Sequence, residues 1–243
     1  MVSLRMSRKR YLTILAVAYT IIWALLAIHP KYRSDWWLEN ALIFVGVFIL
    51  VATYKPLPLS RVSYTLIFVF MCLHTIGAHY TYAEVPYDAW LESHFGFTIA
   101  DLTGWKRNYF DRLVHFCYGL LLAYPIREVF QRIANVRGFW GYFLPLDLTM
   151  STSMLYELME WGAAAIFGGD LGPAFLGTQG DVWDAQKDMA LASLGAAIAM
   201  LINALINSIY QRDFAREWSD SLRVRGKRPL GEEEFRRMTN SGK

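Results

Sequence analysis

Three short motifs pair carboxylate or histidine side chains at spacings that put both members on one helix face. The motifs are Asp111 with His115, Glu157 with Glu160, and Asp184 with Asp188. Residues three or four positions apart are neighbours on the surface of an α-helix. Histidine nitrogens and carboxylate oxygens together suit zinc, manganese and related divalent ions. The chemistry that these residues favour is therefore metal binding with acid–base catalysis.

Two further histidines, in another apolar run, complete the predicted ligand set. The predicted metal ligands are His74, His79, Asp111, His115, Asp184 and Asp188. Glu157 or Glu160 is the predicted catalytic base, because each carboxylate raises the proton affinity of the other. The predicted substrate-binding or supporting residues are Arg112, Gln179, Asp181 and Lys187. For His74 a hydrogen bond between two helices is an equal alternative, and for Asp181 a helix N-cap is favoured.

The composition of the 243 residues indicates that these motifs lie in a membrane. Hydrophobic residues make up 55% of the chain and the mean hydropathy is +0.24, more than a soluble domain needs to fill its core. A net charge of +3 gives no reason to expect a nucleic-acid partner. Cys72 and Cys117 lie inside apolar runs and are typical of small buried side chains, not of a disulfide framework.

Six apolar runs are long enough to cross a bilayer. A helix rises about 1.5 Å per residue, so a hydrocarbon core of about 30 Å needs roughly 20 residues. The runs cover residues 11–28, 38–54, 62–82, 111–130, 139–167 and 182–210. We therefore expect an all-α polytopic membrane bundle of six transmembrane helices over residues 1–210. Residues 211–243 are expected to form a basic cytoplasmic tail.

The basic residues predict how this bundle is oriented. If the N-terminus is cytoplasmic, 18 of the 24 Lys and Arg residues lie on the inner side. The positive-inside rule then places both termini in the cytoplasm and all the motifs in the outer half of the bundle. With six carboxylates ionised beside Arg112 and Lys187, this layer would carry about −4. Such a charge requires protonation, histidinium or a bound metal ion.

Three longer strings of residues carry a family resemblance. They cover residues 107–116, 156–161 and 177–189, the last of which begins within a glycine-rich link over 168–180. With these strings the chain resembles the YjdF-type bacterial inner-membrane proteins, whose function is unassigned. The resemblance covers nearly the whole chain, including His74 and His79, and implies a multi-pass protein of the bacterial inner membrane.

A more distant resemblance is to the VanZ-like membrane proteins. Asp111, Arg112 and His115 match the first element of the VanZ-like pattern, and Glu157 begins the second. Glu160 stands where that pattern has Gln, and Asp188 where it has Asn, which makes the present site more acidic. The resemblance implies a place for the site rather than a reaction.

The function expected from these residues is a metal-dependent hydrolase or transferase that acts on a lipid or lipid-linked headgroup at the outer leaflet. A divalent ion, zinc or manganese by preference, would lower the pKa of a bound water molecule. Two alternatives remain open at this point. One is a proton- or cation-coupled transporter that uses the same carboxylates as a relay. The other is a membrane assembly factor in which the polar layer fixes helix packing.

Overall fold

A computed structural model describes residues 6–104, 107–167, 178–224 and 230–240 of the chain. Among these residues the regular structure is helical and no strand occurs. Six helices are long: α1 (Arg8–Leu26), α2 (Arg33–Thr53), α3 (Arg61–Tyr80), α6 (Phe110–Ile133), α7 (Trp140–Phe167) and α9 (Asp184–Tyr210). Each coincides with one predicted run to within a few residues. The expected all-α helical membrane bundle is therefore confirmed.

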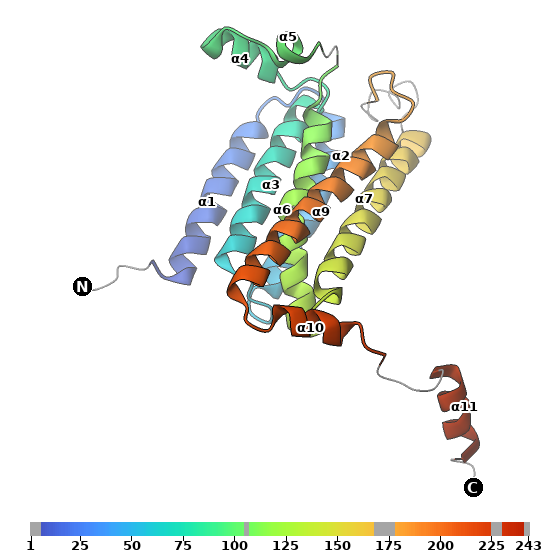
Figure 1. The fold of residues 1–243 in the computed structure, drawn as a ribbon. Coiled ribbons are helices and arrows are strands. Elements are labelled where there is room, and N and C mark those ends of the chain that lie inside the picture. Colours follow the sequence, from blue (N-terminus) through green and yellow to red (C-terminus); the bar gives the residue numbers. More distant parts are fainter. Residues whose placement is uncertain (1–5, 105–106, 168–177, 225–229, 241–243) are drawn as a thin grey trace.

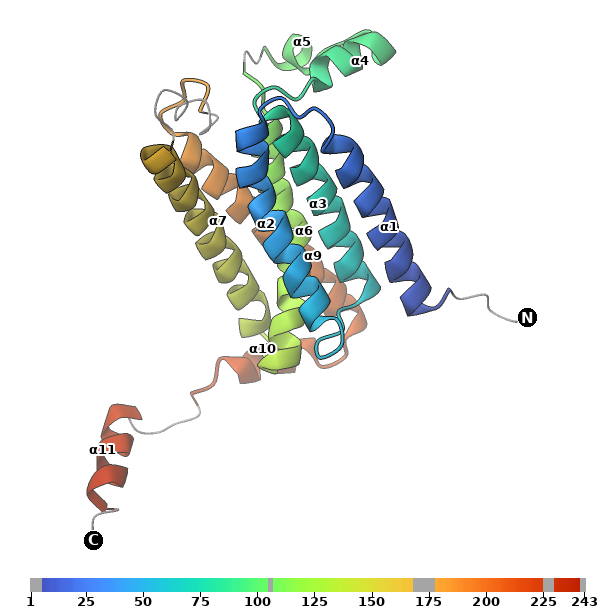
Figure 2. The same ribbon diagram turned by 180° about the vertical axis from the view of Figure 1, so that it is seen from behind.

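Over the described residues, five of the six long helices are long and apolar enough to cross a membrane. The sixth, α7, is not among these candidates. Its lower hydropathy has a direct cause, because it carries three carboxylates in 28 residues: Asp147, Glu157 and Glu160. The views from both sides nevertheless show α7 running alongside the other long helices (Figures 1 and 2). Its crossing of the membrane stays a prediction.

The long helices form one bundle with α6 near its centre (Figure 1). Helix α6 contacts α3, α7 and α9, whereas α1 and α2 pack against α3. The short helices α4 (Tyr87–Phe95) and α5 (Ile99–Thr103) lie at one end, which we name the outer end after the predicted orientation. Helix α10 (Phe214–Ser221) lies across the opposite, inner end, and α11 (Leu230–Asn240) lies beyond it. The start of α1 and the end of α9 share the inner end, as expected for an even number of crossings.

Small residues allow α6 and α9 to pack closely. A side chain added at Gly119 would overlap the backbone carbonyl oxygen of Ala192, and one added at Gly195 would overlap that of Phe116. Ala192 and Ala196 are fully buried in the same contact. Small residues at a helix interface let two backbones approach closely in a membrane. This contact fixes α6 and α9 relative to each other just below the residues that they carry at the outer end.

The outer start of α6 is held by hydrogen bonds from several segments. The Asn108 side chain accepts a hydrogen bond from the Phe110 backbone N–H at 3.0 Å and donates one to the Val85 carbonyl oxygen at 2.9 Å. The backbone N–H of Tyr109 donates to the Tyr87 hydroxyl at 3.0 Å. Polar groups at a helix start that would otherwise lack partners are thereby satisfied. These contacts fix the position of the first turn of α6, which carries Asp111.

Candidate metal centre

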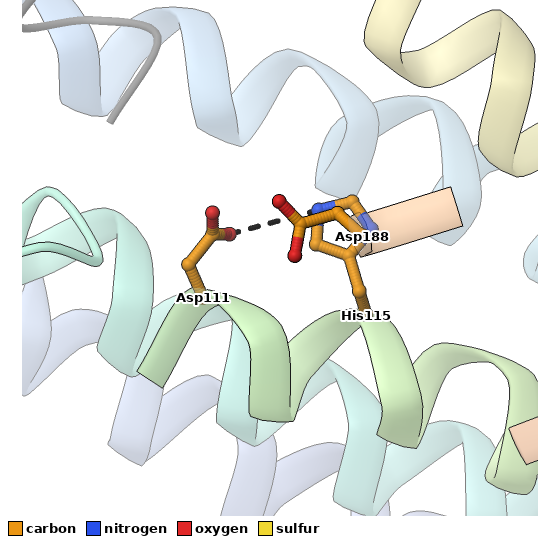
Figure 3. Close-up of side chains that lie close together, drawn as sticks. All are labelled: Asp111, His115 and Asp188. Atoms are coloured by element: carbon orange, nitrogen blue, oxygen red, sulfur yellow. Dashed lines mark ion pairs between the residues drawn. The ribbon is translucent and has the colours of Figure 1, made fainter. Parts of the chain in front are cut away.

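Asp111, His115 and Asp188 meet at the outer end of the contact between α6 and α9 (Figure 3). Asp111 and His115 are one helical turn apart on α6, and an Asp111 carboxylate oxygen lies 3.6 Å from His115 Nε2. Asp188 comes from the second turn of α9. One ligand atom from each of the three residues lies within 4.8 Å of the others. The spacing predicted from the sequence therefore brings these three side chains together, and we name them the triad.

Glu157 approaches the triad from α7. Its Oε1 atom lies 3.4 Å from His115 Nε2, and its side chain is 11% exposed. Within the described part of the chain, Glu157 Oε1 and Asp188 Oδ1 are buried and have no hydrogen-bond partner. A buried carboxylate oxygen without a partner costs free energy, so a bound cation or a proton would stabilise these two atoms. A divalent ion fits this donor set, because it would give both oxygens a partner.

Asp184 lies one turn before Asp188 but faces a different partner. Arg107 Nη1 lies 2.7 Å from its carboxylate, and Arg112 Nη2 lies 3.1 Å from it. The same two guanidinium groups approach Asp181, at 3.5 Å and 2.5 Å. We name these four residues the ion-pair cluster. The structure therefore places Asp184 among cations rather than in the triad, where the sequence analysis expected it.

Asp181 precedes α9 and is the most strongly paired member of the ion-pair cluster. Its carboxylate accepts hydrogen bonds from Lys187 at 2.6 Å, from the Trp183 backbone N–H at 3.1 Å and from Arg112 at 2.5 Å. These contacts hold the pKa of Asp181 well below its usual range. Asp181 is therefore ionised at any physiological pH, and it anchors Arg112 and Lys187. It is not the N-cap of α9, because that position is Trp183 and no side chain caps the helix.

A second buried set lies beside the triad and links α2, α3 and α7. Glu39, on α2, is 8% exposed and accepts a hydrogen bond from the Tyr156 hydroxyl at 3.2 Å. His74 Nε2 lies 3.1 Å from the Glu39 carbonyl oxygen, and His74 Nδ1 lies 2.5 Å from the Tyr82 hydroxyl. We name these four residues the tyrosine–histidine set. It gives His74 the helix-bridging role that was the alternative to metal binding.

Three other predicted site residues are placed as follows. Glu160 lies within electrostatic reach of Glu39, Asp111 and Glu157. His79 Nδ1 lies 2.7 Å from the Leu26 carbonyl oxygen at the end of α1, so the structure does not bring it to the triad. The Gln179 side chain pairs with the backbone of Asn108 through two hydrogen bonds of 2.9 Å, which tie the chain before α9 to the start of α6. Residues 168–177 of the glycine-rich link lie outside the described residues.

Four residues of this outer layer do not stand out in the sequence. They are Glu39, Tyr82, Arg107 and Tyr156. Glu39 could have been identified, because it is a carboxylate inside a predicted span. It lies next to the predicted start of that span, however, where a charged side chain costs little free energy. Arg107 precedes its helix and its partner is 77 residues away, so nothing in the local pattern indicates the pairing.

The outer layer as a whole is acidic. Among the described residues it holds seven carboxylates: Glu39, Asp111, Glu157, Glu160, Asp181, Asp184 and Asp188. Its fixed cations are Arg107, Arg112 and Lys187. Full ionisation with neutral histidines would leave four negative charges without a partner. A buried excess of this kind favours protonation or a bound cation.

Comparisons with known proteins agree on a membrane family. The family model described as "Predicted membrane protein (DUF2238)" matches residues 11–208. The chain is 36% identical over 200 residues to the inner membrane protein YjdF of Escherichia coli (strain K12), an alignment that covers 82% of this chain and 91% of that protein. The predicted YjdF-type resemblance is thereby confirmed. Neither match supports the predicted VanZ-like resemblance, and no solved structure matches the chain.

Proposed function

The chain belongs to the DUF2238 family of membrane proteins, and from that premise we propose that it is a metal-dependent hydrolase or transferase of the inner membrane. In this proposal the triad of Asp111, His115 and Asp188 holds one divalent ion, zinc or manganese by preference. The substrate is a lipid or lipid-linked headgroup at the outer leaflet. The observation that carries the proposal is the meeting of three ligand atoms within 4.8 Å, from two buried residues, His115 and Asp188, and the half-buried Asp111.

The choice of metal follows from the donor set. One imidazole nitrogen and two carboxylate oxygens suit zinc and manganese better than the thiolate-seeking ions. The triad is also short of positive charge, because the nearest guanidinium nitrogen to Asp188 is Arg112 Nε at 4.0 Å. His115 and Asp188 are 8% and 2% exposed. A site this dry strengthens the attraction between the ligands and a divalent cation.

Glu157 is the residue best placed to move a proton. When bound, the metal ion would supply electrophilic activation of a water molecule. Glu157 Oε1 lies 3.4 Å from His115 Nε2 and has no hydrogen-bond partner among the described residues, so it is free to accept a proton beside the triad. A carboxylate in this position accepts the proton of an attacking water molecule and returns it to the leaving group. Glu160, which lies toward Glu39, is less directly placed for this step.

The ion-pair cluster supports an anionic substrate. Within the described chain, Arg107 Nε, Arg107 Nη2 and Arg112 Nε are buried donors without a hydrogen-bond partner. Guanidinium groups bind phosphate through paired N–H donors. The cluster adjoins the triad through Arg112, at the end of the bundle where a headgroup of the outer leaflet would lie. A phosphate-bearing headgroup is therefore the substrate class that this arrangement favours.

Metal analysis of the purified protein tests the proposal first. We expect about one zinc or manganese ion per chain in the wild type, purified at neutral pH without chelators. His115→Ala and Asp188→Asn should lose it. Asp147→Asn is the matched control, since Asp147 is a carboxylate of α7 in the same bundle but lies outside the triad. A wild-type protein without stoichiometric metal would contradict the proposal and favour the proton relay, which proton flux in proteoliposomes would then show.

A further inference from the structure

A separate cavity lies in the inner half of the bundle, between α3, α6 and α9. Its volume is about 420 Å³. Part of its lining is aliphatic and includes Leu66, Leu120 and Ile202, whereas Tyr124, Arg127 and Asn207 supply polar groups nearer the inner end of α6 and α9. The cavity shares no lining residue with the triad. Its lining thus offers both aliphatic side chains and polar groups, as the acyl chain and the headgroup of a phospholipid require.

Arg127 is the charged group of this cavity. Its guanidinium lies 4.6 Å from the centre of the Tyr142 ring. With the Gln131 amide turned so that its oxygen faces Arg127, that oxygen accepts from both terminal guanidinium nitrogens, at 2.9 and 3.1 Å. Within the described residues, Arg127 Nε is buried without a hydrogen-bond partner and no carboxylate forms an ion pair with this side chain. Arg127 is therefore a cation whose charge the described protein does not neutralise.

Two other arginines of α6 are paired with carboxylates, unlike Arg127. Arg132, five residues further along α6, pairs with Glu128 at 3.5 Å, and Arg112 has three aspartates within 4.0 Å. An unpaired cation inside a membrane protein is costly, and such residues mark ligand sites by default. Arg127 lies about 9 Å from the last residue of α6, a depth close to that of a phosphate group at the edge of the hydrocarbon.

We propose that this cavity binds an anionic phospholipid of the inner leaflet, with the lipid phosphate on Arg127. The guanidinium group donates to the phosphate oxygens, as arginine does at phosphate sites generally. An acyl chain follows the aliphatic lining between α3 and α9. Basic pockets between transmembrane helices on the cytoplasmic side bind anionic headgroups in this way. The site is independent of the proposed metal centre at the opposite end of the bundle.

Lipid titration of the purified full-length protein tests the site. Short-chain phosphatidylglycerol is added to protein in a non-ionic detergent, and bound lipid is counted by native mass spectrometry. Arg127→Gln removes the charge, and Ile202→Trp fills the cavity without changing charge at a side chain that is 49% exposed. Arg216→Gln is the matched control, because it removes an arginine from α10, where the side chain is 83% exposed.

We expect both Arg127→Gln and Ile202→Trp to weaken phosphatidylglycerol binding at least tenfold, and the control to bind as the wild type does. If Arg127→Gln does not fold, Ile202→Trp decides the outcome alone. Unchanged binding in the folded variants would overturn the proposal. Equal binding of short-chain phosphatidylcholine would show that net charge is not recognised, and full competition by inorganic phosphate would show a free-anion site. Either result would overturn the assignment to an anionic lipid.

Discussion

At the scale of single residues, Glu157 and Glu160 show how one helical turn separates two environments. Both were expected to lie near the metal site, and a spacing of three residues rotates one side chain by about 60° from the other. Glu157 Oε1 lies 3.4 Å from His115 Nε2. Glu160 lies within electrostatic reach of Glu39 on α2 as well as of Asp111, but among the described residues it forms no ion pair with His115. We therefore assign the proton transfer to Glu157.

This assignment predicts unequal effects of two matched substitutions. Glu157→Gln should keep the metal content of the wild type but lower turnover about 100-fold or more, the usual cost of losing a general base. Glu160→Gln should lower turnover less than tenfold. The readout is headgroup release from labelled bacterial phospholipids, with metal content measured on the same samples. Equal losses in the two variants would show that the base is assigned wrongly.

Asp181 predicts how stability depends on pH. Hydrogen bonds from Lys187, Trp183 and Arg112 lower its pKa in the folded protein below the unfolded value of about 4. The folded state therefore gains stability above the unfolded pKa and loses it as the pH falls toward the folded pKa. Arg107 Nη1 also lies 3.5 Å from the Asp181 carboxylate.

The measurement is the difference in melting temperature between the wild type and Asp181→Asn. It should be constant from pH 8 to pH 5 and shrink below about pH 4. A difference that shrinks already between pH 8 and pH 6 would show that Asp181 is not the low-pKa group described here.

The residues of the triad could be predicted from the sequence more fully than the residues that surround the triad. Asp111 and His115 follow from a spacing of four residues on one helix, which any helix places on one face. Asp184 and Asp188 have the same spacing, yet only Asp188 joins the triad, because Arg107 reaches Asp184 from a distant segment. His79 contacts the Leu26 carbonyl oxygen at the end of α1 instead, and which element a helix face meets is a tertiary property. Local patterns predict which residues share a face but not what that face meets.

At the scale of secondary-structure elements, the contact between α6 and α9 determines whether the triad exists. Asp111 and His115 belong to one helix and Asp188 to the other, and the two helices touch through Gly119 and Gly195. The six hydrophobic runs predicted both helices, but nothing in the hydropathy pattern showed that they are neighbours. The glycines could have indicated it, because small residues mark close helix contacts in membranes.

Gly119→Val should therefore separate α6 from α9. The added side chain would meet the Ala192 backbone, which cannot move aside as a side chain can, so we expect a loss at the upper end of the roughly 1–3 kcal/mol typical of overpacking. The bound metal should be lost as well. Gly162→Val is the matched control on α7, where an added Cβ meets no atom within 4 Å. Equal melting temperatures and equal metal content in the two variants would contradict this account of the contact.

At the scale of the whole molecule, the chain is a multi-pass inner-membrane protein whose polar residues are divided between its two ends. The triad, the ion-pair cluster and the tyrosine–histidine set lie at the end that carries α4 and α5 (Figure 1). The termini of the bundle and α10 lie at the other. The basic residues alone predict which end faces the cytoplasm.

Thiol labelling of intact cells tests this orientation. In a background of Cys72→Ala and Cys117→Ala, a cysteine introduced at Ser93 on α4 should react with a membrane-impermeant reagent. One introduced at Ser219 on α10 should react only after the cells are opened. Both positions are exposed in the structure. The reverse pattern would place the triad at the cytoplasmic side and would exclude a substrate in the outer leaflet.

The central claim is that His115 and two carboxylates hold one divalent ion. X-ray absorption at the zinc edge of the purified, zinc-loaded protein measures this directly. We predict an inner shell of nitrogen and oxygen ligands at about 2.0–2.2 Å with the outer-shell scattering of a single imidazole ring, and loss of the imidazole signal in His115→Ala. A spectrum without imidazole scattering, or one that is the same in the wild type and His115→Ala, would contradict the claim.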